Sequence, residues 1–205
     1  MKKVAIIDYG MGNLDSVARA IEECRGNPVI TERAEDLKDA NYIILPGVGS
    51  FGDGMRNIKA LGLEPILKEE VLQNGIPLLG ICLGMQLLAS CGYEGGKAAG
   101  LDLIPGEVLR FLPDRPGVKI PHIGWNEVVL ERSHPLFAGI PSGKDFYFVH
   151  SYHFVCESQE DILSRTPYCG GFVSGVQRGN VLGVQFHPEK SLQVGLKLLS
   201  NFLFL

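Results

Sequence analysis

The chain has 205 residues, of which 45% are hydrophobic and 20% are charged, and its formal net charge is −4 at pH 7. This length suits one domain with a sizeable core, so we expect residues 1–205 to form a single domain. The charge provides no basic stripe for nucleic acid and no polybasic anchor for a membrane, and we expect neither as a partner. Five cysteines without regular spacing argue against a disulfide framework and predict a reducing, cytoplasmic compartment.

The first half of the sequence alternates between short apolar runs and segments with helical spacing. These patterns predict strands at residues 4–7, 28–31, 42–45 and 77–82, and helices at residues 14–24, 35–40, 64–74 and 85–90. Asn13 stands where it can cap the first of these helices. Such alternation favours a mostly parallel central sheet.

The second half of the sequence has a different pattern. Aromatic and β-branched runs at residues 108–112, 125–130, 146–155 and 171–177 are separated by proline and glycine, without long helical segments between them. This pattern predicts antiparallel strands added to one side of the parallel sheet. A last core strand at residues 181–186 and a closing helix at residues 192–205 complete the predicted elements.

The motif Gly80-Ile-Cys82-Leu-Gly84 lies where the fourth predicted strand turns into a helix. We interpret it as a nucleophile elbow, in which the corner residue has a strained backbone and the flanking glycines avoid collisions with the neighbouring backbone. A cysteine at a helix N-terminus tends towards the nucleophilic thiolate. The alternative is a small buried core cysteine, so the hypothesis needs a base elsewhere in the chain.

A glycine-rich segment, residues 46–54, follows the third predicted strand. Ligands of open parallel sheets bind at the carboxyl ends of the strands, where this segment is placed. Its backbone N–H groups, at Val48 or Gly49, could approach a substrate oxygen closely, so we predict an oxyanion loop. A flexible connector is the alternative, because glycine is common in loops.

The last core strand leads directly into His187-Pro188-Glu189. A nucleophilic cysteine needs a base within hydrogen-bond reach, and a carboxylate commonly orients that base. In an extended segment residues i and i+2 point the same way, so Glu189 can hold the ring of His187. Cys82, His187 and Glu189 are therefore the predicted catalytic triad.

Three other features suggest sites that we do not predict. Gly10-x-Gly12 lacks the third glycine of a dinucleotide fingerprint, because Asp15 stands there. His150 and His153 would face opposite sides of one strand and could not share a metal, so we expect no metal and no cofactor. The uncharged residues 71–93 are interrupted by Pro77 and the elbow glycines too often for a membrane span.

Three segments together resemble the motifs of the class I, triad-type glutamine amidotransferases. They are Pro46-Gly-Val-Gly49, Gly80-Ile-Cys-Leu-Gly-Met-Gln86 and Val184-Gln-Phe-His-Pro-Glu189, and their order and spacing cover nearly the whole chain. Together with the predicted elements, the resemblance implies a flavodoxin-like α/β fold of three layers, with a mostly parallel central sheet, helices on both faces and added antiparallel strands in the C-terminal half.

The resemblance also implies a mechanism and a set of site residues. Cys82 would attack the side-chain amide of L-glutamine, His187 would protonate the departing ammonia, and water would release glutamate from a thioester. The backbone N–H of Leu83 would join the predicted loop in stabilising the oxyanion. The positions that match substrate-binding residues of the family are Gln86, Glu94, Ser151 and Tyr152.

Within this family the chain is most similar to the amidotransferase subunits of imidazole glycerol phosphate synthases, of histidine biosynthesis. The segments that carry this resemblance are Ile7-Asp-Tyr-Gly-Met-Gly-Asn13, Lys119-Ile-Pro-His-Ile-Gly-Trp-Asn126 and Tyr147-Phe-Val-His-Ser-Tyr152. It implies a heterodimer with a (β/α)8-barrel cyclase subunit that receives ammonia through a tunnel. Positions that match the partner face are Asn13, Trp125, Tyr147 and Lys190.

Other functions remain open at this point. The amidotransferase subunit of anthranilate or aminodeoxychorismate synthase would share the triad, although Trp125 and residues 8–13 speak against it. A cysteine hydrolase of γ-glutamyl peptides would act alone. A binding subunit without activity is disfavoured by the complete triad.

Overall fold

The computed structural model describes residues 2–205, and five parallel strands form its centre. Their order across the sheet is β2-β1-β3-β4-β13, which is the flavodoxin-like order and confirms the predicted fold class. The strands span Lys3–Ile7 (β1), Asn27–Thr31 (β2), Tyr42–Leu45 (β3), Leu78–Ile81 (β4) and Val181–Val184 (β13). Because these strands are parallel, the segments that follow β3, β4 and β13 leave the sheet at the same edge.

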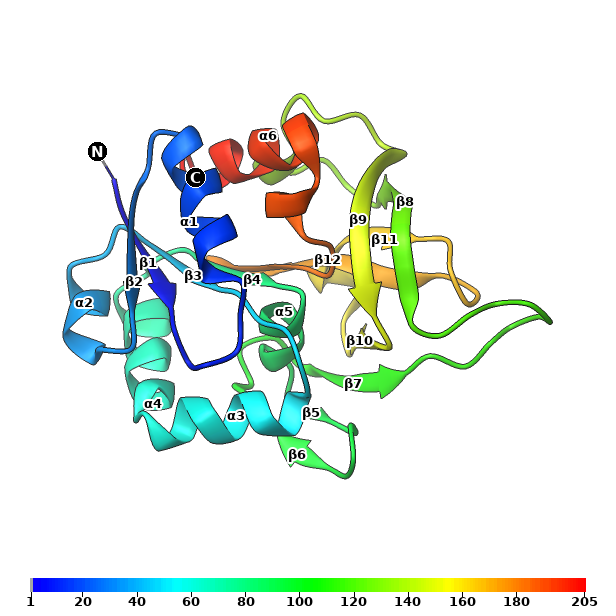
Figure 1. Cartoon of the computed structure of the whole chain (residues 1–205), viewed down its shortest axis with the longest axis horizontal. Helices are drawn as coiled ribbons and strands as arrows, with labels where there is room; N and C mark the ends of the chain where they lie inside the picture. Colours follow the sequence, from blue (N-terminus) through cyan, green and yellow to red (C-terminus); the bar gives the residue numbers. More distant parts are fainter. Residues whose placement is uncertain (1) are drawn as a thin grey trace.

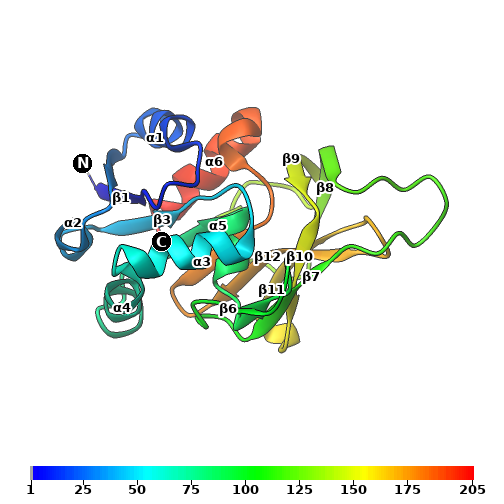
Figure 2. The ribbon, with the colours of Figure 1, turned by 60° about the horizontal axis from the view of Figure 1, so that its bottom comes forward.

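Helices cover both faces of this sheet (Figures 1 and 2). Alternate residues of β1 enter two separate cores, with Val4 and Ile6 in one and Ala5 and Ile7 in the other. The first core includes helices α1 (Leu14–Glu23) and α6 (Leu192–Phe202). The second includes α2 (Ala34–Lys38), α3 (Phe51–Ala60), α4 (Leu63–Lys68), which continues as the π-helical turn η1 (Glu69–Gln73), and α5 (Leu83–Leu87).

Mostly antiparallel strands extend the sheet beyond β13, as predicted (Figure 1). The path continues through β12 (Phe172–Arg178), β10 (Tyr152–Cys156), β7 (Gly106–Arg110), β5 (Cys91–Gly92) and β6 (Ala98–Ala99). A branch from β12 runs through β11 (Ile162–Thr166) and β8 (His122–Leu130) to β9 (Lys144–His150). Short 3-10 turns are η2 (Pro135–Phe137), η3 (Gln159–Asp161) and η4 (Pro188–Lys190).

The aromatic run at residues 146–155 is not the single strand that its composition predicts. It is broken at Ser151, so β9 pairs with β8 while β10 pairs with β7 and β12. His150 belongs to β9 and His153 to β10, so the alternation of side chains along one strand does not apply to this pair. The prediction that the two rings face opposite sides is therefore wrong. Both rings pack against Phe111, with centroid distances of 5.1 and 4.7 Å. Residues 2–205 nevertheless contain no group of three side chains placed to hold a metal ion.

The glycine-rich segment is shorter than predicted, because α3 begins at Phe51. Ser50 caps this helix by accepting a hydrogen bond from the Asp53 N–H, at 3.3 Å. The Ser50-x-x-Asp53 spacing is the sequence signal for this helix start, and the prediction overlooked it. Conversely, Asn13 occupies the N-cap position of α1 but makes no capping side-chain hydrogen bond.

The uncharged residues 71–93 form η1, β4, α5 and β5 rather than one continuous helix. None of the helices in residues 2–205 combines the length and the hydrophobicity that a membrane span requires.

The tight packing of α5 against β3 gives a test of stability. A side chain at Gly84 would overlap the carbonyl oxygen of Leu45, whereas Gly52, in α3, has no atom within 4 Å of the place for a Cβ. We expect Gly84→Ala to lower the free energy of unfolding by about 3 kcal/mol or more. Gly52→Ala should be neutral or stabilise the protein by up to about 1 kcal/mol, since alanine is the better helix former. Urea unfolding of both variants measures the difference; equal midpoints would contradict this account.

Candidate active site

Cys82 occupies the corner between β4 and α5. Its φ is +54°, a conformation that non-glycine residues rarely adopt. A Cβ at Gly80 would lie 2.7 Å from the Gly84 carbonyl oxygen, and one at Gly84 would overlap the carbonyl of Leu45. The flanking glycines are thus required by close backbone contacts, and the corner has the geometry of the predicted elbow.

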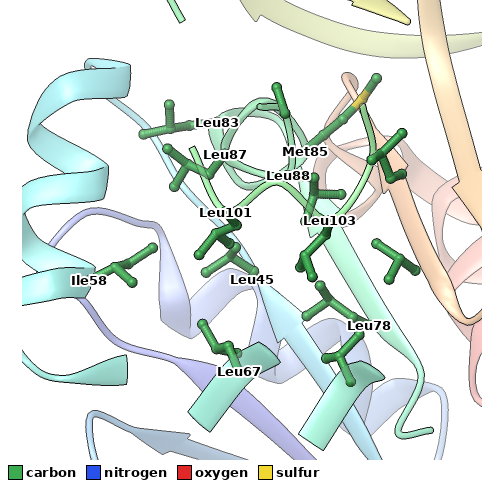
Figure 3. Packing of buried hydrophobic residues seen from close by; sticks show 14 of the residues in the cluster. Leu45, Ile58, Leu67, Leu78, Leu83, Met85, Leu87, Leu88, Leu101 and Leu103 are labelled. Atoms are coloured by element: carbon green, nitrogen blue, oxygen red, sulfur yellow. The ribbon is translucent and has the colours of Figure 1, made fainter. Parts of the chain in front are cut away.

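The short helix after the corner is anchored by a buried apolar cluster (Figure 3). Leu83, Met85 and Leu87 of α5 are at most 2% exposed and belong to the same core as Leu45 and Leu78. The helix begins at Leu83, two residues earlier than predicted, and spans only five residues. Packing rather than helix length therefore fixes the orientation of the Cys82 side chain.

His187 and Glu189 follow β13 and are brought together as predicted. His187 Nδ1 lies 2.8 Å from Glu189 Oε1, and the two side chains are 3% and 2% exposed. The backbone between them is not extended, because Pro188–Lys190 forms the 3-10 turn η4. The main chain of His187 is held on both sides, since its N–H donates to the Tyr147 carbonyl at 2.9 Å and its carbonyl accepts from the Ser191 hydroxyl at 2.6 Å.

The surroundings of His187 favour its protonated form. Burial alone would lower the pKa of its imidazole, but the negative charge of a thiolate at Cys82 and the contact with Glu189 outweigh burial and raise this pKa to about 10. Its Nε2 makes no hydrogen bond of normal geometry, although the Cys82 side chain is near enough to contribute to the raised pKa. His187 thus has one nitrogen fixed by a carboxylate and the other available for proton transfer.

A cavity of about 250 Å³ lies over Cys82, and every predicted oxyanion and substrate residue lines it. These residues are Val48, Gly49, Leu83, Gln86, Glu94, Ser151 and Tyr152, joined by Val149 and His150. The volume suits a small ligand. A larger hollow of about 620 Å³ between α1 and α6 contains none of these residues.

The loop between β3 and α3 is tightly packed, which disfavours a flexible connector. The Tyr9 hydroxyl donates to the Pro46 carbonyl at 2.8 Å, and a side chain at Gly47 would overlap that hydroxyl. Gly49 has a φ of +107°, which only glycine adopts readily. The Leu83 N–H donates to the Gly47 carbonyl at 3.3 Å, so this predicted oxyanion donor is engaged within the protein.

Gln86 and Glu94 both make definite contacts within the protein. The buried Gln86 donates from Nε2 to the Tyr152 carbonyl at 2.9 Å and to Gln185 Oε1 at 3.0 Å. Both of its N–H groups are thus used, and only its Oε1 is left for a ligand. Glu94 accepts from the Phe51 N–H at 2.8 Å, at the start of α3, with its second carboxylate oxygen outside this bond.

Gln185 and His150 were assigned no role from the sequence, although both contact the site. Gln185 donates from Nε2 towards the Cys82 sulfur at 3.7 Å and is fully buried. His150 lines the cavity and contacts the Tyr152 carbonyl through Nδ1 at 2.8 Å. Both residues could have been recognised from the sequence because they are polar residues within otherwise apolar strands. A buried amide or imidazole in such a strand requires a hydrogen-bond partner.

The predicted partner residues lie on neighbouring elements. Trp125 and Tyr147 are opposite each other on β8 and β9, with ring centroids 6.1 Å apart. Lys190 ends η4, which contacts both β9 and α1, and Asn13 precedes α1. Asn13, Trp125 and Lys190 are exposed, whereas Tyr147 is half-buried.

Comparisons with known proteins show which proteins this chain resembles. The profile of the class-I glutamine amidotransferase family matches residues 5–205. The imidazole glycerol phosphate synthase subunit HisH of Moorella thermoacetica is 53% identical over 203 residues, which cover 98% of this chain and 94% of that protein. The HisH subunit of Methanosarcina acetivorans is 47% identical, with 98% of each chain covered.

The structure of PurLQS from Thermotoga maritima superimposes with a TM-score of 0.74 over 100% of this chain and 99% of that one, at 21% identity. This last likeness concerns the fold alone. The match of the family profile to almost the whole chain and the identity to HisH subunits establish that this chain is a class-I glutamine amidotransferase of the HisH group.

Proposed function

We propose that this chain is the glutaminase subunit of an imidazole glycerol phosphate synthase, with Cys82 as its nucleophile. The observations that carry the proposal are the small cavity lined by Cys82 and a buried histidine, His187, whose ring is fixed by Glu189 and whose pKa responds to the charge of Cys82. A strained corner cysteine, a base and an orienting carboxylate are the parts that amide cleavage through a covalent intermediate requires.

The reaction proceeds in two halves. The Cys82 thiolate adds to the side-chain amide carbon of glutamine, and the C–N bond then breaks as His187 Nε2–H protonates the departing ammonia. A water molecule, deprotonated by His187, attacks the resulting thioester; glutamate leaves and the thiolate is regenerated. The oxyanion of each tetrahedral intermediate accepts hydrogen bonds from Leu83 N–H and from the loop at Val48 or Gly49, which requires the Gly47 carbonyl to turn away from Leu83 N–H.

The rest of the cavity accounts for the two ends of glutamine. We assign the α-amino group to Glu94, whose carboxylate suits a positive charge, and the α-carboxylate to the backbone of Ser151–Tyr152. The support for both assignments is that these residues line the cavity. Gln86 binds the substrate through Oε1, because its N–H groups are already used.

The ammonia passes to a (β/α)8-barrel cyclase subunit, which forms imidazole glycerol phosphate and an aminoimidazole carboxamide ribonucleotide. The curated relatives are named as subunits of a synthase, which supports a heterodimer. We assign the partner surface to Asn13, Trp125, Tyr147 and Lys190. Trp125 supports this assignment because its side chain is 49% exposed, which is unusual for a large aromatic residue unless it meets a partner.

Replacing the nucleophile separates its chemical role from a structural one. Cys82→Ala should lower glutamine hydrolysis by at least about a thousandfold, because no covalent intermediate can form. The complex of the variant with its cyclase should still make product from added ammonium salts, since that step does not need the cysteine. Cys169→Ala, at a partly exposed cysteine outside the cavity, is the control. Loss of both activities in Cys82→Ala would mean that Cys82 is structural.

The charge on Cys82 should be visible in the titration of His187. Because the thiolate raises the pKa of His187 to about 10, wild-type His187 should stay protonated through neutral pH. In Cys82→Ala that charge is gone, and the midpoint should fall by at least about one pH unit. NMR titration of the imidazole C–H signals measures both, with His134 as an internal reference that should not move. An unchanged His187 midpoint would show that the thiolate is not its main partner.

The isolated chain should hydrolyse glutamine weakly and be strongly stimulated by a cyclase partner loaded with its nucleotide ligand. The reason is that Leu83 N–H is engaged by Gly47 in the chain alone, which leaves the oxyanion without one donor. Co-purification followed by glutaminase assays with and without partner and ligand tests this. High activity of the chain alone would indicate a self-sufficient γ-glutamyl hydrolase. Recovery of a chorismate-using enzyme would indicate an anthranilate or aminodeoxychorismate synthase subunit.

A further inference from the structure

A continuous chain of buried and partly buried hydrogen bonds runs from strand β8 to the nucleophile. It begins at Asn126 Nδ2, which lies 3.2 Å from His122 Nε2, and continues from His122 Nδ1 to His150 Nε2 at 3.1 Å. His150 Nδ1 reaches the Tyr152 carbonyl at 2.8 Å. The same carbonyl accepts from Gln86, which also bonds Gln185, and Gln185 contacts the Cys82 sulfur.

The direction of each bond in this chain follows from the Tyr152 carbonyl, which can only accept. His150 Nδ1 must therefore carry a proton, and its Nε2 accepts from His122 Nδ1–H. His122 Nε2 in turn accepts from the Asn126 amide. Burial lowers the pKa of His122 to about 4 and that of His150 to about 3, so both rings are neutral near pH 7, as this pattern requires.

The same reasoning fixes the two amides near the sulfur. Gln86 directs one N–H to the Tyr152 carbonyl and the other to Gln185 Oε1. Because Oε1 of Gln185 is taken by this bond, its NH2 group must face Cys82, where the N···S distance is 3.7 Å. A buried N–H aimed at sulfur stabilises the thiolate more than the thiol, since hydrogen bonds to ions are the stronger ones.

We propose that Gln185 is a further residue of the catalytic site, whose amide N–H stabilises the Cys82 thiolate, and that Gln86, Tyr152, His150 and His122 hold this amide in its orientation. Gln185 touches the reacting atom, whereas His122 and His150 act through others and are positioning residues. The inference rests on the proposed function only in taking Cys82 as the nucleophile.

The test is the pH dependence of Cys82 alkylation by iodoacetamide in the full chain, without glutamine or partner, read out by peptide mass spectrometry. Gln185→Glu keeps the shape and the acceptor for Gln86 but replaces the amide donor with a carboxylate, whose negative charge would itself disfavour the thiolate. Gln185→Met removes the donor without adding a charge and is therefore the deciding variant. We expect the alkylation midpoint to move upward by roughly one pH unit. The titratable groups that interact with the sulfur, His187 and Tyr9, remain in the variant.

Two further variants make the result decisive. An upward shift in Gln185→Met shows the effect of losing the N–H donor alone, and any larger shift in Gln185→Glu shows the added charge. Gln177→Glu, at an amide bonded to Arg132 and the Gly179 carbonyl, is the matched control and should leave the midpoint unchanged. An unchanged midpoint in a folded Gln185 variant would overturn the role of Gln185.

The positioning role is tested by a double-mutant cycle. His122→Phe keeps an aromatic ring beside Tyr168 and Phe148 but breaks the chain. Alone it should shift the alkylation midpoint upward by less than the Gln185 variant does, and in the Gln185→Glu background it should add nothing, because its effect passes through that amide. Additive shifts would overturn the positioning role.

If wild-type Cys82 does not react ahead of the other four cysteines, the proposed function fails instead.

Discussion

The close approach of Gly84 to the Leu45 carbonyl is the contact on which the site depends. It allows α5 to start directly against the end of β3, and the chain can reach that position only if Cys82 adopts its positive φ. Such a conformation costs on the order of 1–3 kcal/mol. Burial of Leu83, Met85 and Leu87 offsets this cost, since each buried aliphatic side chain contributes roughly 1.5–3 kcal/mol.

The other parts of the site are placed relative to this corner by the order of the sheet. β4 lies between β3 and β13 with parallel pairing on both sides. The loop at Gly47 and the turn at His187 therefore leave the sheet at the same edge as Cys82. Residues far apart in the sequence meet there because their strands are neighbours, and no contact between the motifs themselves is needed to bring them together.

This dependence on strand order explains what the sequence could predict. The parallel half was predictable because apolar runs and glycine or proline boundaries are local signals. The placement of Cys82, His187 and Glu189 was predictable because these residues follow strand ends. Helix α3 was missed because its glycines suggested a loop, although Ser50 caps it. The break at Ser151 was missed because it depends on two different partners of β9 and β10, and pairing is a tertiary property.

The roles of Gln185 and His150 depend even more on contacts between strands, and they divide the site into two kinds of polar group. The amides of Gln185 and Gln86 and the rings of His122 and His150 have partners, which fixes their orientation. His187 Nε2 makes no hydrogen bond to the rest of the protein, and the charge of Cys82 acts on its imidazole. The amides and rings of this frame are therefore hydrogen-bonded, whereas two buried atoms of the predicted triad, His187 Nε2 and Glu189 Oε2, make no hydrogen bond.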